Sequence, residues 1–154
     1  MRTHMDRIFE VDATPDQVWE LVSDLRRVLA HTEPGTEVAM EGGDTPIKQG
    51  AKFHLTTKSG LKSDWTIVTF IPPKQISQRI DLGVWDGGIS TVTLEPTEGG
   101  TRVTLRTPTM PWPQTWAPVR YGTWPLVLRD AKRTGERFER AVRAHVAELG
   151  GAGT

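Results

Sequence analysis

The sequence contains no cysteine among its 154 residues. Disulfides, thiolate metal sites and cysteine nucleophiles are therefore excluded. It also lacks any run of about 18 apolar residues, the length that a membrane-spanning helix needs. The first residues, MRTHMDRIFEVDATPD, show no apolar segment of the kind found in secretory signal peptides. These absences predict a cytoplasmic protein with no stable membrane insertion.

Neither sign of charge is in excess. Lys plus Arg and Asp plus Glu each number 19, so the strongly basic surface typical of nucleic-acid-binding proteins is not expected, and neither is a nucleic-acid partner. The four histidines show no metal-ligand spacing such as HExxH. The stretches EGGDTPIKQG and DGGIS do not open a helix after a strand, as phosphate-binding loops do. We therefore expect neither a metal nor a cofactor.

The length indicates one domain, residues 1–149, followed by a disordered tail, residues 150–154. A short strand over RIFEV is followed by a strong helix-start signal. Thr14 is a good N-cap, and Gln17 stands three residues later to complete a capping box. A second short helix is predicted to begin near Asp24 and to end before the next proline.

Between residues 36 and 107 the sequence alternates between polar and apolar residues with period two, interrupted by turn signals. Segments such as KFHLTT, DWTIVTFI, QISQRIDL, ISTVTLEP and TRVTLRT read as strands. Their short connections predict an antiparallel sheet of about six strands, to which RIFEV adds a seventh. By strand parity, Thr69 and Gln78 should face the core.

A long helix is predicted from about Pro125 to Leu149, with apolar residues recurring on one face. The start of that face is small, with Ala131, Thr134 and Gly135, whereas Phe138 and later residues are larger. Small residues against a curved sheet leave room for a cavity. The alternative is that bulky sheet residues fill the space.

The stretch TMPWPQTWAPVRYGTWP, residues 109–125, holds three of the six tryptophans, the only tyrosine and four of the eleven prolines, and no acidic residue. It links the last predicted strand to the long helix. Its prolines should keep it from extending either element, and Pro125 should lie in the first turn of the helix. We expect its aromatic residues to line or cap a cavity.

The motifs VDATPDQVWELVSDL, TFIPPKQI and STVTLEPTEGGTRVTLR, in this order and spacing, resemble the START-like (SRPBCC) helix-grip superfamily. This superfamily includes the birch-pollen allergens, the lipid-transfer START domains and the bacterial polyketide cyclase/dehydrase proteins. The resemblance covers Ile8 to Leu149. It implies an α+β fold in which a seven-stranded curved antiparallel sheet grips a long C-terminal helix, with two short helices after strand 1 and an apolar cavity inside.

Within the superfamily, the sequence is most similar to the aromatase/cyclase branch, whose members fold a poly-β-keto chain and promote aldol closure and dehydration. Tryptophans and inward-facing arginines line the pocket in that branch. The resemblance places Trp65 at an inward tryptophan position. Ile71 and Leu82 stand where it would place inward arginines, and the opposite parity of Arg79 predicts that this cation faces solvent.

The ligand-binding residues expected from strand parity, helix face and resemblance share a place beside the cavity. They are Trp65, Thr69, Gln78, Trp112, Trp116, Tyr121, Trp124, Ala131, Thr134 and Phe138. No general base is evident among them. Tyr121 is a candidate proton donor, and the alternative is an amphipathic residue at the rim.

Three functions remain open. The first is a polyketide cyclase or dehydratase that shapes a reactive chain by proximity and exclusion of water. The second is a non-catalytic carrier of a polyketide-, lipid- or isoprenoid-like molecule. The third is an interaction protein of the toxin or quinone-chaperone type. A small hydrophobic ligand is the expected partner in the first two, and a biosynthetic enzyme, a carrier protein or a second copy of the chain could accompany it.

Overall fold

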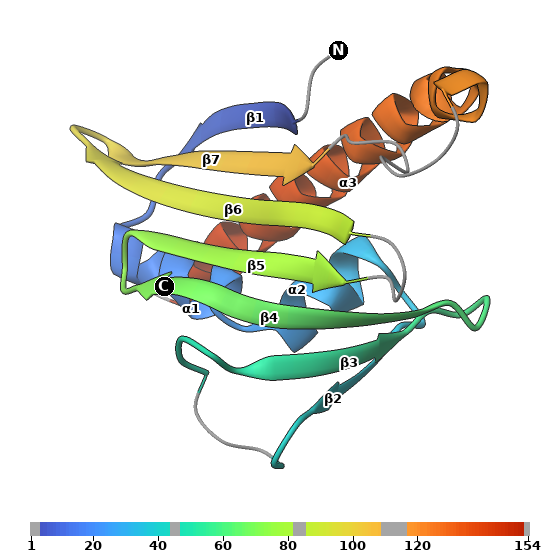
Figure 1. Ribbon diagram of the computed structural model, residues 1–154. Helices are drawn as coiled ribbons and strands as arrows, with labels where there is room; N and C mark the ends of the chain where they lie inside the picture. Colours follow the sequence, from blue (N-terminus) through green and yellow to red (C-terminus); the bar gives the residue numbers. More distant parts are fainter. Residues whose placement is uncertain (1–3, 44–46, 82–85, 109–116, 153–154) are drawn as a thin grey trace.

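The computed structural model describes residues 4–43, 47–81, 86–108 and 117–152. The strands form one antiparallel sheet in the order β1-β7-β6-β5-β4-β3-β2, and the long helix α3 crosses it (Figure 1). The fold is the predicted helix grip. Its elements are β1 (His4–Val11), α1 (Pro15–Val22), α2 (Leu25–Thr32), β2 (Glu37–Met40), β3 (Lys52–Thr56), β4 (Lys62–Ile71), β5 (Gln75–Asp81), β6 (Asp86–Thr97), β7 (Gly100–Pro108) and α3 (Ala117–Ala152).

The two short helices begin where the sequence predicts. The side chain of Thr14 accepts a hydrogen bond from the backbone of Gln17, and the Gln17 side chain accepts one from the backbone of Thr14. This reciprocal pair satisfies two of the N–H groups that a helix start leaves without partners. Asp24 caps α2 in the same way by accepting from Arg27.

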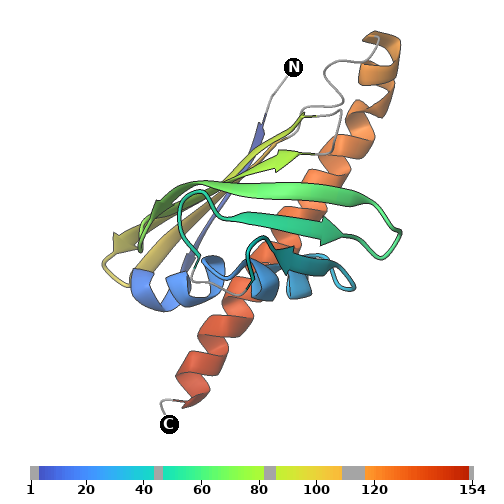
Figure 2. The same cartoon turned by 60° about the horizontal axis from the view of Figure 1, so that its bottom comes forward.

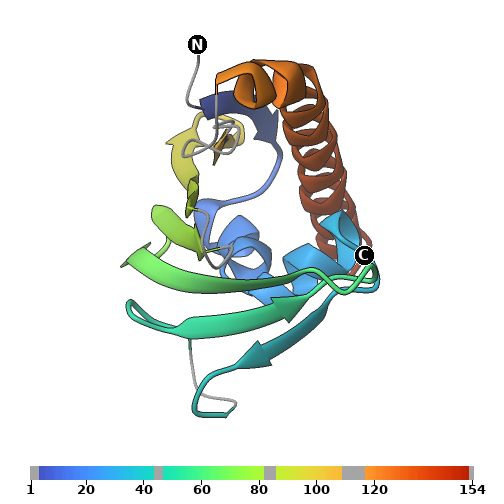
Figure 3. The ribbon, with the colours of Figure 1, turned by 45° about the vertical axis from the view of Figure 1, so that its right-hand side comes forward.

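The sheet is curved, and α2 and α3 lie on its concave side (Figure 3). Strand alternation directs apolar side chains to this side, where they meet the inner face of α3. Edge-to-face packing of Phe9 on Phe138, with ring centroids 6.2 Å apart, joins β1 to α3. The core is contiguous and includes Phe9, Val18, Leu21, Phe53, Ile67, Ile76, Leu94, Val103, Phe138 and Val142.

Thr69 does not face the core, and that prediction is wrong. The register of β4 shifts between Ile67 and Thr69. After Ile67, the next side chain of β4 that faces the core is therefore Phe70 rather than Thr69. Phe70 pairs with the buried Ile76, whereas Thr69 pairs with its neighbour Ser77 on the opposite face. A bulge inserts one extra residue and reverses the alternation beyond it, a change that strict period-two reading misses.

Helix α3 is longer than predicted at both ends. It begins at Ala117 rather than near Pro125, and it continues to Ala152, into the stretch predicted to be a disordered tail. Pro125 therefore lies inside the helix, where a proline has no N–H to donate, and the helix continues beyond it. Figure 3 shows the first turns of α3, in orange, at an angle to the rest. Both ends of α3 extend past the sheet (Figure 2).

His145 fastens α3 to the two short helices. It is 7% exposed. Its Nε2 lies 3.0 Å from the carbonyl oxygen of Gln17, and its Nδ1 lies 3.2 Å from the guanidinium of Arg27. A buried imidazole with a partner at each nitrogen holds the helices in register.

Thr101 makes a similar buried link between the start of β7 and the segment before α1. Its hydroxyl donates to the carbonyl oxygen of Ala13 at 2.6 Å, and the residue is fully buried. Thr101→Val keeps the shape but leaves that carbonyl without its partner, so we expect the free energy of unfolding to fall by about 1–3 kcal/mol. Urea denaturation measures the change. Thr101→Ser keeps the hydroxyl and is expected to lose less, and equal losses in both variants would contradict the role of the hydrogen bond.

Candidate functional site

A cavity of about 280 Å³ lies between the concave side of the sheet, α2 and the middle of α3. Apolar side chains from all three line most of it, and hydroxyl and amide groups are interspersed. Its described lining consists of Val22, Leu25, Val28, Leu29, Thr32, Glu33, Trp65, Gln78, Ile80, Ser90, Val92, Leu105, Thr107, Pro108, Asp130, Thr134 and Phe138. An apolar void of about 150 Å³ already admits benzene, so this cavity has room for a small organic molecule.

Four of the residues predicted from the sequence are brought together in this lining: Trp65, Gln78, Thr134 and Phe138. Trp65 takes part by its ring, because its indole N–H donates to the hydroxyl of Ser63 at 3.1 Å. That N–H is therefore already used and is not free to bind a ligand. Gln78 is only 6% exposed, although it is polar.

The other predicted residues divide into two groups. Thr69 and Ala131 are not in the described lining: Thr69 lies on the outer side of the sheet, and Ala131 is a buried residue of α3. Trp112 and Trp116, and the side chains of Tyr121 and Trp124, lie outside the residues that the structure describes. Their role at the cavity stays a prediction. Pro108, immediately before this aromatic stretch, does line the cavity.

The small residues of α3 leave room for the cavity and for the side chain of Arg7. Beside Thr134 the space is cavity. Beside Gly135 it is occupied by Arg7 of β1, because a Cβ added at Gly135 would lie 3.0 Å from Cδ of Arg7. Arg7 continues past the helix to Glu139, 2.9 Å away. The size gradient along α3 therefore marks the cavity and also a passage for one inward-facing arginine.

Arg7 is committed to Glu139 and is not part of the described cavity lining. Burial raises the pKa of Glu139, but hydrogen bonds from Arg143 and Arg7 outweigh it and hold that pKa below its usual value. The arginine that faces α3 is thus neutralised by an ionised partner. Arg79 is exposed on the other side of the sheet, as predicted.

Two carboxylates at the cavity were not predicted. Glu33 follows α2, and Asp130 lies on α3, and both belong to the cavity lining. Burial raises the pKa of the Glu33 carboxyl, the negative charge of Asp130 raises it further, and Arg137 partly opposes both. Arg137 itself donates to the carbonyl oxygen of Thr32 at 3.0 Å. The residues stand far apart in sequence, so no local pattern could have paired them.

Other polar groups lie away from the cavity. His54 is exposed on β3, 2.7 Å from Asp64 and 3.5 Å from Glu41. The hydrogen bond that His54 donates to the Asp64 carboxylate, followed by the charges of Asp64 and Glu41, raises the pKa of His54. In the described part of the chain no group of three or more His, Asp or Glu side chains is arranged to hold a metal ion. Nor does a helix there have the length and apolar character needed to cross a membrane.

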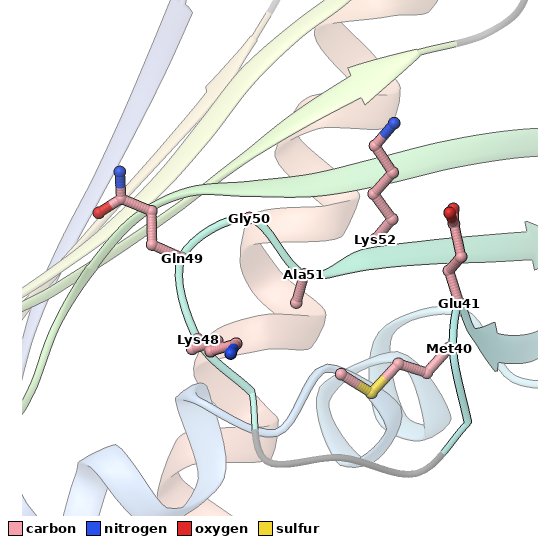
Figure 4. Close-up of a pocket in the computed structure, with 7 residues that line it drawn as sticks. All are labelled: Met40, Glu41, Lys48, Gln49, Gly50, Ala51 and Lys52. Atoms are coloured by element: carbon pink, nitrogen blue, oxygen red, sulfur yellow. The ribbon is translucent and has the colours of Figure 1, made fainter.

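A surface hollow of about 360 Å³ borders the connection between β2 and β3 (Figure 4). Its lining includes the exposed side chains of Lys48, Gln49 and Lys52. Figure 4 shows Lys52 and Glu41 directed to the same side, whereas Met40 and Lys48 point toward one another. The polar groups do not converge on one point, so the hollow lacks the character of a ligand site.

Solved structures share this architecture at low sequence identity. A di-domain ARO/CYC protein, StfQ from the steffimycin biosynthetic pathway, aligns with a TM-score of 0.72 and 15% identity over 97% of this chain and 52% of StfQ. Protein MLL2253 of Mesorhizobium loti aligns with a TM-score of 0.64 and 15% identity, covering 90% of this chain and 96% of its own. For CV1439 of Chromobacterium violaceum the TM-score is 0.62 and the identity 18%, over 95% and 98% of the two chains. At these identities the likeness establishes the fold alone.

A search of curated proteins finds no significant match to the sequence. A family comparison does: residues 2–149 match the family described as polyketide cyclase / dehydrase and lipid transport. The match covers nearly the whole chain, and its description agrees with an internal apolar cavity and a hydrophobic ligand. The chain belongs to this polyketide cyclase / dehydrase and lipid transport family.

Proposed function

We propose that the protein binds one small, mostly apolar molecule in the cavity and, as a cyclase- or dehydratase-like protein, holds a reactive chain there in a folded shape. The observation that carries the proposal is the cavity itself, walled by apolar side chains from α2, α3 and the sheet, with a few hydroxyl, amide and carboxylate groups. Ligand pockets have this composition, because apolar walls bind and a few polar groups orient. The volume suits a ligand at the small end of the usual range.

The side chains of the described cavity lining favour a protein that holds the bound chain in a folded shape over one that relies on strong electrostatic catalysis. None of the described lining residues is arginine, lysine or histidine. An enolate formed in the cavity would meet hydroxyl groups and the amide of Gln78, which are weaker donors than a buried cation. Glu33 is the group best suited to proton transfer, since its raised pKa brings it closer to neutral pH.

The same lining supports a second candidate, a carrier that binds the molecule without changing it. The observation in its favour is the lack of a cation in the described lining, which an aldol closure would use. The two functions differ in their product. Incubation with a short poly-β-keto chain, followed by mass spectrometry, should show loss of water for the cyclase or dehydratase and unchanged mass for the carrier.

Filling the cavity tests ligand binding directly. Thr134→Phe places a ring where the cavity now lies, so we expect binding of n-octanol, measured by isothermal titration calorimetry, to weaken by at least about tenfold, since steric exclusion removes the apolar contacts. The matched control is Arg133→Phe, which adds the same ring at an exposed neighbouring position of α3. Equal affinity in the two variants would show that the alcohol binds elsewhere.

A further inference from the structure

Gln78 is a buried polar side chain of the cavity lining that has no hydrogen-bonding partner among the residues that the structure describes. It is 6% exposed and belongs to the lining. No side chain or backbone group in the described parts of the chain makes a hydrogen bond to the side-chain amide of Gln78. A buried amide without a partner is costly, and native proteins keep such groups rarely. A ligand oxygen or N–H at this point would satisfy it.

The charged residues in the described lining of the cavity are both acidic. Glu33 and Asp130 belong to the lining, and no lysine, arginine or histidine accompanies them among the described lining residues. The nearby Arg137 is not in the lining and donates to the carbonyl of Thr32. The charge of Asp130 reaches Glu33 strongly enough to raise the pKa of the Glu33 carboxyl. The negative charge on this side of the cavity is therefore only partly compensated.

From these two observations we propose that the cavity selects an apolar molecule without negative charge, whose hydroxyl or carbonyl group bonds to the amide of Gln78, and that Glu33 and Asp130 exclude carboxylates such as fatty acids. The inference rests on the proposed function and specifies the ligand class of the same site.

Neither orientation of a fatty acid is favourable. With its carboxylate inward, the ligand would bury a full charge against a neutral amide, apolar walls and hydroxyls, and the described lining holds no cation to replace the lost hydration. With its carboxylate at the α2–α3 side, it would meet two like charges in a partly desolvated place, where repulsion is stronger than in water. An alcohol can place its hydroxyl at Gln78, and an amine can place its ammonium beside the two carboxylates.

Three ligands of one chain length test the proposal: n-octanol, n-octylamine and octanoate. Isothermal titration calorimetry with the full chain at about pH 8, where a free carboxylic acid is ionised, gives each affinity. We expect octanoate to bind at least about tenfold more weakly than the alcohol and the amine, as one uncompensated charge contact of this kind implies. If the affinity for octanoate is less than about tenfold below that for n-octanol or for n-octylamine, the proposal is overturned.

Two sets of variants separate the parts of the site. Gln78→Leu should weaken the binding of n-octanol about fivefold, as expected for one lost hydrogen bond. It should weaken the binding of n-octylamine less. Arg79→Leu is the control, since it changes the next residue of β5 on the outer face. An alcohol affinity equal to that of the original protein would overturn the role of Gln78.

In the double variant Glu33→Gln/Asp130→Asn, the affinities for octanoate and n-octylamine should lie within about twofold of each other. The affinity for n-octanol should be unchanged. The control Glu98→Gln/Glu148→Gln removes the same charge at exposed positions outside the cavity lining and should preserve the gap. If the control closes the gap as well, net charge rather than this cavity discriminates, and the inference is wrong. If none of the three ligands binds, the proposed function fails and the inference falls with it. Tight octanoate binding would overturn the inference alone.

Discussion

Phe138→Ala is expected to lower the free energy of unfolding by about 3–5 kcal/mol and to widen the ligand cavity. The Phe138 ring is 3% exposed, packs edge-to-face on Phe9 and forms part of the cavity wall. Removing it takes away apolar contacts and adds a void that joins the existing one. Guanidinium denaturation measures the loss of stability, and titration with n-dodecanol and n-octanol measures the change in cavity size.

The control is Phe53→Ala. Phe53 is as deeply buried, at 1% exposed, but it is not in the cavity lining. Its removal should cost a similar amount of stability and leave the relative affinity for the two alcohols unchanged. Phe138→Ala should shift that preference toward n-dodecanol. An equal shift of the preference in both variants would mean that the alcohol affinities reflect a general loosening of the core rather than the size of the cavity. If Phe138→Ala does not fold, Phe138→Leu provides a milder change.

Gly100→Ala is expected to lower the free energy of unfolding by about 3 kcal/mol or more, because a methyl group has no space there. A Cβ at this position would overlap the carbonyl oxygen of Val11 and lie 3.0 Å from the carbonyl carbon of Val11 and 3.1 Å from the backbone nitrogen of Ala13. All three atoms belong to the backbone, and the Thr101 hydrogen bond holds the same segment in place. The neighbours therefore cannot move aside cheaply.

The adjacent Gly99 offers the comparison. A Cβ added there meets nothing within 4 Å, so Gly99→Ala should change the free energy of unfolding by less than about 0.5 kcal/mol. Urea midpoints of the two variants, measured side by side, test the argument. Similar losses at both positions would indicate that glycine is needed for turn flexibility rather than for space.

The fold followed from signals that act over short distances. The capping box of Thr14 and Gln17 predicts α1, and Asp24 predicts α2, because the hydrogen bonds that start a helix are made within one turn. The helical spacing of Phe138, Val142 and His145 likewise predicts the inner face of α3. Local chemistry was sufficient for these elements.

The sequence was less informative where geometry depends on irregularity or on distant partners. The bulge near Thr69 leaves no distinctive residue pattern, so parity placed that side chain on the wrong side. Pro125 predicts a helix start, whereas the helix begins at Ala117 and continues through this residue. The approach of Glu33 to Asp130 is made by the packing of α2 on α3, across almost a hundred residues of chain. Such a pair becomes visible only in three dimensions.

The pairing of β1 with β7 bears on how the chain is made. His4 at the start of β1 lies opposite Pro108, and Val11 lies opposite Thr101. A ribosome releases the amino end first, so β1 has no strand to pair with until β7, about ninety residues later in the chain, has been synthesised. Phe9 also waits for Phe138, which emerges later still. Chaperones that shield short apolar segments should therefore meet β1 on the nascent chain before β7 and α3 have emerged.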